Sequence, residues 1–256
     1  MHLIPHFTLL AIIFLWLTSL IAGIIDTLAG GGGLITVPAL LITGLPPVTA
    51  LGTNKLQALV GELNASFHFM HHGHIQIKSI ALGIVCAACG ALLGALTLRH
   101  THPVLLNKLI PFLTLAILIY IILVNRIIKQ TNTPRLSQNS FYLILGLLIG
   151  FYNGFFGAGT GSFWVVALMY FLSFDLKKAT LYGKPLNFTG NFASVFYFIF
   201  TGLINYKIAL VMATGQIIGS FIGAKLVIKQ GVKIIRPAFI LVVSIMTLLL
   251  FIKNYG

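Results

Sequence analysis

The sequence predicts an all-α protein that crosses a membrane several times. Of its 256 residues, 58% are apolar and only 7% are charged, whereas a soluble domain carries charge on about a quarter of its residues. The mean hydropathy of the whole chain is +1.03, so most of its surface is expected to face lipid. This composition excludes a cytosolic enzyme, a nucleic-acid-binding module and a disordered protein. The net charge of +13 is interpreted as loop charge that orients the chain, because the basic residues lie between apolar runs.

Eight apolar runs are long enough to cross a hydrocarbon core of about 30 Å. The first run has no Lys or Arg before it, so it is predicted to be a membrane span and not a signal peptide. The eight predicted spans are Phe7–Ile25, Leu51–Met70, Ser79–Leu98, Val104–Val124, Phe141–Phe156, Leu186–Thr201, Ile208–Ile228 and Ile234–Ile252.

Two further apolar runs, Leu34–Thr43 and Phe163–Phe174, are too short to cross alone, because a helix rises about 1.5 Å per residue. They are predicted to be half-helices or re-entrant segments, which are tolerated at membrane depth only where they are buried in protein or line a cavity. If both cross, the chain has ten crossings; if neither does, it has eight. The positive-inside rule separates the two topologies only narrowly, so both stay open.

The chain is predicted to consist of two tandem repeats, residues 1–124 and 141–256, joined by a polar loop at residues 125–140. Each repeat holds about four full spans and one short half-helix. A shift of 127 positions aligns Asp26 with Asn153 and the glycine runs with each other. A shift of 129 positions aligns Lys55 with Lys184, Gly61 with Gly190, Gly90 with Gly219 and Gly94 with Gly223. Glycines four positions apart let helix backbones approach closely.

Glycine runs precede both short segments. Gly30, Gly31, Gly32 and Gly33 stand before the first, and Gly157 and Gly159 stand before the second. Broken helices in matching places are the sequence feature that indicates the central site of a secondary transporter. A break frees backbone N–H groups, and the helix N-terminus that follows favours an anion. These glycines are therefore predicted to bind substrate; the alternative is that they serve only tight turns and close packing.

The residues around the first glycine run match a known pattern. Asp26-Thr27-Leu28-Ala29, four glycines, Pro38 and then Gly52-Thr53-Asn54-Lys55 resemble the sulfite exporter TauE/SafE family, also called the toluene sulfonate uptake permease family. The resemblance implies a multi-pass carrier in the inner membrane. Sulfite, sulfonates and other sulfur-containing organic anions are among the substrates proposed for that family, so the resemblance names a class of activity and not a cargo. The second repeat departs from the pattern, with Tyr182-Gly183-Lys184-Pro185 in the corresponding place.

A polar stripe runs along the predicted helix after Gly52. At about 100° per residue, the stripe holds Asn54, Gln57, Gly61, Asn64 and His68, and a neighbouring face holds Lys55 and Glu62. Polar residues in an apolar segment should face the protein interior or a water-filled path. Asn54, Lys55, Gln57 and Asn64 are therefore predicted to bind substrate.

Two lysines carry the prediction that the substrate is an anion. Lys55 and Lys184 are expected near the N-termini of their helices, with Pro185 in a first turn, and Lys184 shares a face with Asn187 and Asn191. Because a helix N-terminus is also positive, each lysine needs an anion or a carboxylate beside it. Lys184, Asn187 and Asn191 are thus further predicted substrate ligands. The alternative is that both lysines extend to the lipid headgroups.

Glu62 is the candidate for proton coupling, and Asp26 is the second choice. The chain has only three acidic residues, and burial of a carboxyl group favours its protonated form, so that it can exchange a proton near neutral pH. Their counterparts in the second half are Asn191 and Asn153, which cannot ionise. The alternative for Glu62 is a structural pair with Lys55 or a hydrogen bond to a neighbouring helix.

Cysteines and histidines define two competing functions. Cys86 and Cys89 have the spacing of a redox dithiol, which would suit an intramembrane thiol-redox carrier, but one cysteine per repeat is expected for that role. A metal-ion exporter would need the histidines at positions 68, 71, 72 and 74, which have no nearby cysteine or carboxylate. Close helix packing and an interfacial polar cap are the interpretations adopted.

These features together predict a proton-coupled permease for a small anion in the inner membrane. The chain is not expected to be an enzyme, to hold a cofactor or metal, or to bind nucleic acid. The glycine runs lack the Lys-Ser/Thr ending of a phosphate-binding loop, so ATP hydrolysis is not expected either. The expected partners are a small anionic substrate and the bilayer, and a homo-oligomer is left open.

Overall fold

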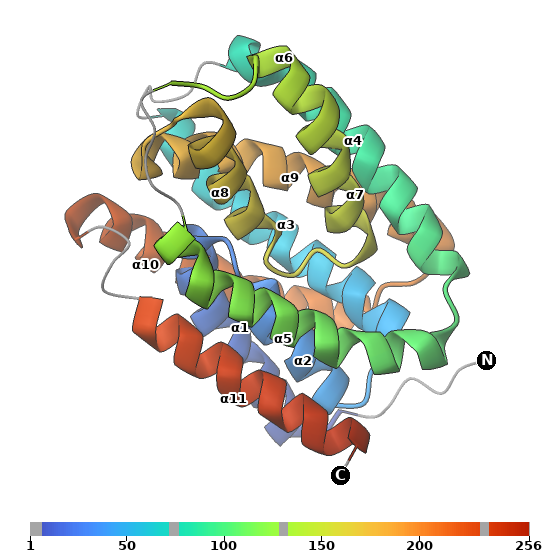
Figure 1. The fold of residues 1–256 in the computed structure, drawn as a ribbon. Helices are drawn as coiled ribbons and strands as arrows, with labels where there is room; N and C mark the ends of the chain where they lie inside the picture. Colours follow the sequence, from blue (N-terminus) through green and yellow to red (C-terminus); the bar gives the residue numbers. More distant parts are fainter. Residues whose placement is uncertain (1–6, 72–76, 128–132, 231–235, 256) are drawn as a thin grey trace.

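The computed structural model describes residues 7–71, 77–127, 133–230 and 236–255, and within these ranges the chain forms helices and connecting turns without a strand. The predicted all-α fold is confirmed (Figure 1). In chain order the helices are α1 Leu9–Ala29, α2 Gly33–Ile42, α3 Pro47–His71, α4 Ile77–His100, α5 Pro103–Ile127, α6 Gln138–Phe141, α7 Leu147–Phe155, α8 Thr160–Leu172, α9 Leu176–Thr201, α10 Tyr206–Gln230 and α11 Arg236–Tyr255, with a π-helical turn, Tyr142–Gly146, between α6 and α7.

In the part of the chain that the structure describes, four helices, α1, α4, α5 and α10, are long and apolar enough to cross a membrane. The two short predicted runs form the short helices α2 and α8, each placed directly after a glycine run. Large apolar side chains on the outer helices, such as Leu10, Leu210 and Leu241, are exposed. Their exposure fits a surface that meets lipid.

The helix α9 begins earlier than predicted, and this changes the setting of its lysine. Asp175 caps its N-terminus by accepting a hydrogen bond from the Lys178 amide at 2.8 Å. Pro185 therefore lies inside the helix and not in its first turn. Lys184 stands eight positions after Leu176, and Lys55 stands eight positions after Pro47 at the start of α3. The expectation that both lysines lie at helix N-termini is wrong, because the dipole effect is confined to the first turn.

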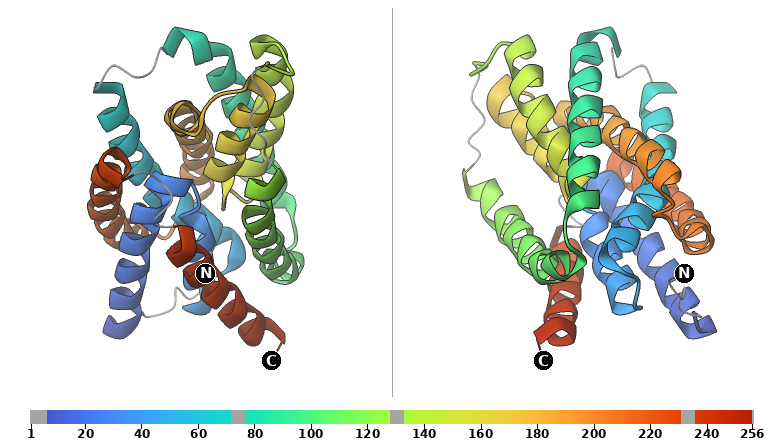
Figure 2. Two further views of the ribbon diagram at one scale, coloured as in Figure 1. Left: turned by 60° about the vertical axis from the view of Figure 1, so that its left-hand side comes forward. Right: turned by 90° about the vertical axis from the view of Figure 1, so that its right-hand side faces the viewer.

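The two polar helices α3 and α9 lie in the middle of the bundle and contact each other (Figure 1). α1 packs along α10, and this pair contacts α3; α4 packs along α7, and this pair contacts α9. Figure 2 shows from two further sides that α5 and α11 lie next to each other. Each outer pair joins one helix from each half of the sequence. The division into residues 1–124, 125–140 and 141–256, and the repeat itself, stay predictions.

Glycines make the contact within each outer pair close. A Cβ atom added to Gly94 would overlap the main-chain oxygen of Phe151 in α7, and one added to Gly219 would overlap that of Leu20 in α1. The close backbone approach expected from glycines four positions apart is thus confirmed. Rigid outer pairs of this kind hold α3 and α9 between them.

The Gly154→Ala substitution in α7 should lower the melting temperature in detergent. The new methyl group would overlap the main-chain oxygen of Ala91 in α4, and overpacking of this kind costs about 1–3 kcal/mol. Gly183→Ala in α9 is the matched control, since the nearest atom to its added Cβ is 3.3 Å away. It should lower the melting temperature far less than Gly154→Ala, because its methyl group makes only a slightly tight contact with Trp164 and alanine favours a helix by up to about 1 kcal/mol over glycine. Equal melting temperatures for the two variants would contradict the close α4–α7 contact.

Candidate functional site

The two glycine runs meet at the centre of the bundle. Gly30 ends α1 with a left-handed φ of 69°, and Gly159 precedes α8 with a φ of 80°. The amide of Ser162 donates to the carbonyl of Gly30 at 3.1 Å, and neither Gly30 nor Gly161 has room for a side chain against the other. The two broken segments therefore contact each other through their backbones.

The other predicted glycines lie around this contact. Gly31 packs against the ring of Phe239, Gly33 packs against Ala158, and Gly157 lies beside the Lys55 amine. The amide of Gly32 donates to Asp26 Oδ1 at 3.1 Å. Thus the anion position expected at the first glycine run is occupied by the chain's own carboxylate.

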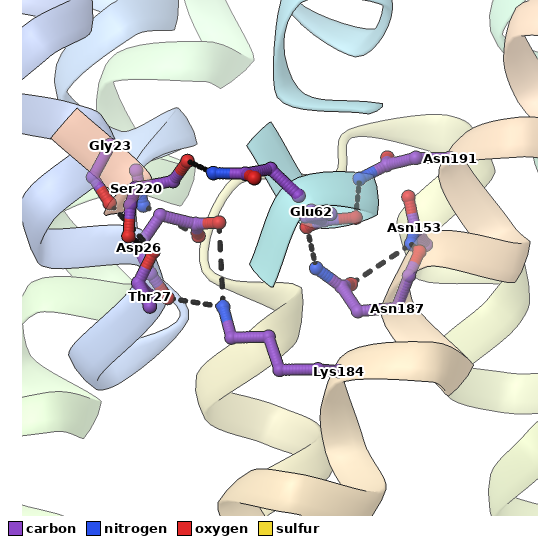
Figure 3. Close-up of polar contacts among 11 residues, drawn as sticks. Gly23, Asp26, Thr27, Glu62, Asn153, Lys184, Asn187, Asn191 and Ser220 are labelled. Atoms are coloured by element: carbon purple, nitrogen blue, oxygen red, sulfur yellow. Dashed lines mark hydrogen bonds and ion pairs between the residues drawn. The ribbon is translucent and has the colours of Figure 1, made fainter. Parts of the chain in front are cut away.

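Lys184 of α9 reaches the C-terminal end of α1. Its amine donates to the main-chain oxygen of Asp26 and lies 3.4 Å from Asp26 Oδ2, the one salt bridge within the described ranges (Figure 3). This carbonyl, which also accepts from the Gly30 amide at 2.8 Å, lies in the last turn of α1, at the negative end of the helix dipole. Lys184 therefore stabilises the end of α1 and is stabilised by it.

Lys55 of α3 makes the corresponding contact with α7. Its amine donates to the main-chain oxygen of Asn153, near the C-terminal end of α7, and to Asn153 Oδ1 at 2.6 Å. A third hydrogen bond runs to Asn191 Oδ1 at 3.2 Å. All three acceptors are neutral oxygens, so Lys55 is a fully hydrogen-bonded cation without a carboxylate at ion-pair distance among the described residues.

Glu62 lies between two asparagines of α9. Its Oε2 accepts from Asn191 Nδ2 at 2.8 Å, and its Oε1 accepts from Asn187 Nδ2 (Figure 3). Asn191 thus joins Glu62 to Lys55, and the two charged groups form no direct pair. Asn153 completes the group by donating to Asn187 Oδ1 at 3.1 Å. We call these seven residues, Asp26, Lys55, Glu62, Asn153, Lys184, Asn187 and Asn191, the central network.

The central network is buried. Lys55 is 0% exposed and Lys184 is 3% exposed, so the alternative in which both lysines extend to the headgroups is wrong. Two of the three acidic residues of the chain lie in the network; the third, Asp175, is the exposed cap of α9. With all four groups ionised, the two lysines and two carboxylates balance each other.

The remaining predicted ligands lie on another face of α3. Asn54 and Gln57 contact Thr36 of α2, with Thr36 Oγ1 donating to Asn54 Oδ1 at 2.5 Å, and Asn64 donates to Ser220 of α10 at 2.9 Å. No hydrogen bond between these side chains and the central network is found in the described ranges. The structure thus separates the predicted site into two polar groups.

Sequence reasoning missed Asn153 as a ligand, and it missed Thr36 and Ser220. Asn153 was noted only as the counterpart of Asp26, although a single asparagine within an apolar run is itself a signal. Thr36 and Ser220 give no such signal, because both residue types are common in membrane helices.

The two competing functions, a thiol-redox carrier and a metal-ion exporter, depend on the cysteines and the histidines. Cys86 is buried and Cys89 is exposed, and both are free thiols on α4. His72 and His74 lie outside the described residues, as do the side chains of His68 and His71.

The Asp26→Ala substitution should destabilise the protein by about 3–5 kcal/mol, because it leaves Lys184 buried without its carboxylate partner. We expect the Asp26→Ala variant to show a much lower melting temperature in detergent than the unmodified protein. Combining it with Lys184→Met should recover much of the loss, since no unpaired charge then remains. Lys177→Met, which removes an exposed lysine in the first turn of the same helix, is the control and should change stability by less than about 0.5 kcal/mol. A small effect of Asp26→Ala would show that the pair does not compensate the buried charge.

Comparison with known proteins identifies relatives along nearly the whole chain. The profile of the sulfite exporter TauE/SafE family matches residues 15–250. A "Probable membrane transporter protein" of Haemophilus influenzae is 41% identical over 239 residues, which cover 93% of each chain. The "Probable membrane transporter protein YfcA" of Escherichia coli K12 is 36% identical over 242 residues, 94% of this chain and 90% of the relative. No solved structure matches this chain. The extent of these matches shows that the chain belongs to the sulfite exporter TauE/SafE family of membrane transporters.

Proposed function

We propose that the protein is a secondary transporter that moves a small anion, such as sulfite, a sulfonate or another organic anion, across the inner membrane. When the anion binds, it takes the place of the protein's own central carboxylates beside the buried lysines. The observation that carries this proposal is the pair of buried lysine amines, brought from α3 and α9 to the point where two broken helices meet. Charged residues buried in membrane spans pair with one another or mark the path of a substrate or ion, and the central site of a secondary transporter lies where its broken helices meet.

Lys55 is the amine at which an anion gains most. Its three hydrogen bonds go to neutral oxygens, so an anionic oxygen that replaces one of them forms a stronger, charge-assisted bond. Lys184 already has the Asp26 carboxylate, which a sulfonate or carboxylate group must displace. Gly157 lies directly against the Lys55 amine, which leaves no room for a side chain at this position.

Proton coupling follows from the charge balance of the central network. Adding an anion to a balanced site leaves an uncompensated negative charge in a low-dielectric region, which is costly. A proton on Glu62 removes that cost, so that one proton accompanies one monovalent anion. The charged groups that act on Glu62 are Asp26, Lys184 and Lys55, and the ones that contact it are the amides of Asn187 and Asn191.

Protonation of Glu62 also frees a donor for the substrate. An ionised carboxylate accepts from both asparagine amides, whereas the protonated form carries an O–H donor on one oxygen and gives up acceptor capacity there. One amide N–H then needs another acceptor, and an anion near Lys55 supplies it. Protonation and anion binding thereby favour each other.

Uptake of labelled sulfite, methanesulfonate, sulfate and acetate into liposomes containing the purified protein tests the substrate class. We expect saturable uptake of at least one of these anions, with loss of more than about 90% of it in Lys55→Met, since removing a charge-assisted partner of a bound anion costs several kcal/mol. Lys207→Met, which removes an exposed lysine of α10, is the control and should transport normally. Uptake that is unchanged in Lys55→Met would contradict the proposed role of the buried amines.

Glu62→Gln should remove the dependence of uptake on an imposed proton gradient while leaving the protein folded, because glutamine keeps the shape of the side chain and cannot ionise. Uptake with and without the gradient, together with a size-exclusion profile, gives the measurement. Asp175→Asn, which changes the exposed acidic cap of α9, is the matched control and should keep the gradient dependence. If Glu62→Gln responds to the gradient as the unmodified chain does, Glu62 is not the coupling group.

A further inference from the structure

A second polar face of α3, next to the one that carries Lys55 and Glu62, contacts α2 and α10. The Gln57 amide donates to Asn54 Oδ1 at 3.1 Å and to Thr36 Oγ1 at 3.3 Å. Gly61, four positions further along, lies directly against the side chain of Gln216. Asn64 then donates to Ser220 Oγ at 2.9 Å. The polar face thus contacts α2 at Gln57 and α10 from Gly61 to Asn64.

Two buried oxygen atoms along this polar face, one on α3 and one on α10, have no hydrogen-bond partner among the residues that the structure describes. They are Gln57 Oε1 and Gln216 Oε1, and each of these side chains is 1% exposed. Buried polar atoms in proteins are nearly always paired with protein or water. Both orphan atoms are acceptors, so they need a donor and cannot be ligands of the anion. Water is the donor that suits a polar interface of this kind.

Burial decreases toward one end of this polar face. Thr36, Gln57 and Gln216 are buried, whereas Asn64 is half-buried and hydrogen-bonded at the edge. An amide side chain that faced lipid would be costly, so the exposed part of Asn64 is expected to meet water. The polar face therefore leads from solvent near Asn64 to the buried amide of Gln57.

The corresponding interface in the other half of the chain is apolar. Under the shift of 129 positions, the counterparts of Gln57, Asn64, Gln216 and Ser220 are Leu186, Ala193, Ala87 and Ala91. These four residues are all buried, and the helices that carry them, α9 and α4, also pack together. Helix packing alone thus does not require the polar residues of the α3–α10 interface.

We propose that the α3–α10 interface is a water-lined access path that opens at Asn64 and reaches α3 beside Glu62. Gly61 immediately precedes Glu62 and leaves room for the Gln216 amide against the backbone of α3. The purpose of the path rests on the proposed function: it connects the proton-coupling carboxyl group with solvent. Its existence does not depend on which anion is carried.

Cysteine accessibility tests the path without a substrate. The full chain is prepared with Cys86→Ala and Cys89→Ala, which removes both native thiols, and is reconstituted into liposomes. Gln57→Cys and Gln216→Cys are each treated with a membrane-impermeant, cationic methanethiosulfonate, and the modified fraction is read by mass spectrometry. Leu186→Cys is the matched control, since it is equally buried on α9 at the position corresponding to Gln57.

We expect both glutamine positions to react at least about tenfold faster than Leu186→Cys, because only thiols that reach water ionise and react. If Gln57→Cys does not give a single size-exclusion peak, Gln216→Cys on the other helix decides the matter. Equal rates at Gln216→Cys and Leu186→Cys, or no reaction at either glutamine position, would overturn the path. Failure of the proposed function reads differently: an unchanged gradient response of Glu62→Gln removes the coupling role and leaves these labelling rates as they are.

Discussion

Compensation of two buried lysine charges is the constraint on which the rest of the structure depends. Removing an amine from water costs several kcal/mol unless hydrogen bonds and opposite charge replace the water. Here each amine is held by a main-chain carbonyl near the C-terminal end of a broken helix, Asp26 of α1 or Asn153 of α7. A helix that continued past Asn153 would pair this carbonyl internally. The breaks therefore supply the acceptors that make the buried lysines tolerable.

The sequence suggested that each lysine lies at the positive end of its own helix and therefore needs an anion beside it. The structure shows the opposite arrangement. Each lysine lies at the negative end of a partner helix and not at the positive end of its own, so no substrate is needed to stabilise it. The Asp26 carboxylate, which contacts both Lys184 and the Gly32 amide, already occupies the expected anion position of the first half. A substrate must exchange with these internal partners. Such exchange suits a carrier, which has to release its cargo as readily as it binds it.

Sequence patterns predicted the helices well because apolar runs and glycine breaks are local features. The short helices α2 and α8 follow the two glycine runs as expected. The start of α9 was missed because the polar turn after Asp175 looks like a loop, although Asp175 is a good helix cap. Lys55, Lys184 and Glu62 could be singled out as charged residues in apolar segments. Their partners could not be named, since Lys55–Asn153 and Lys184–Asp26 join residues 98 and 158 positions apart, and no local spacing encodes such contacts.

Differences between the two halves are more informative than their likeness. Lys55 and Lys184 make the same kind of contact, yet one meets an asparagine and the other an aspartate. Glu62 likewise stands where the second half has Asn191, and the two side chains are hydrogen-bonded to each other. Both carboxyl groups thus come from the first half of the sequence. Most of the polar residues along the second polar face also come from the first half, and only Gln216 and Ser220 come from the second. If the two halves resembled each other for packing alone, the ionisable groups would not need to be gathered in one of them. In the proposed mechanism Glu62 takes the exchanged proton, and Lys55, whose hydrogen-bond partners are neutral residues of the second half, binds the anion.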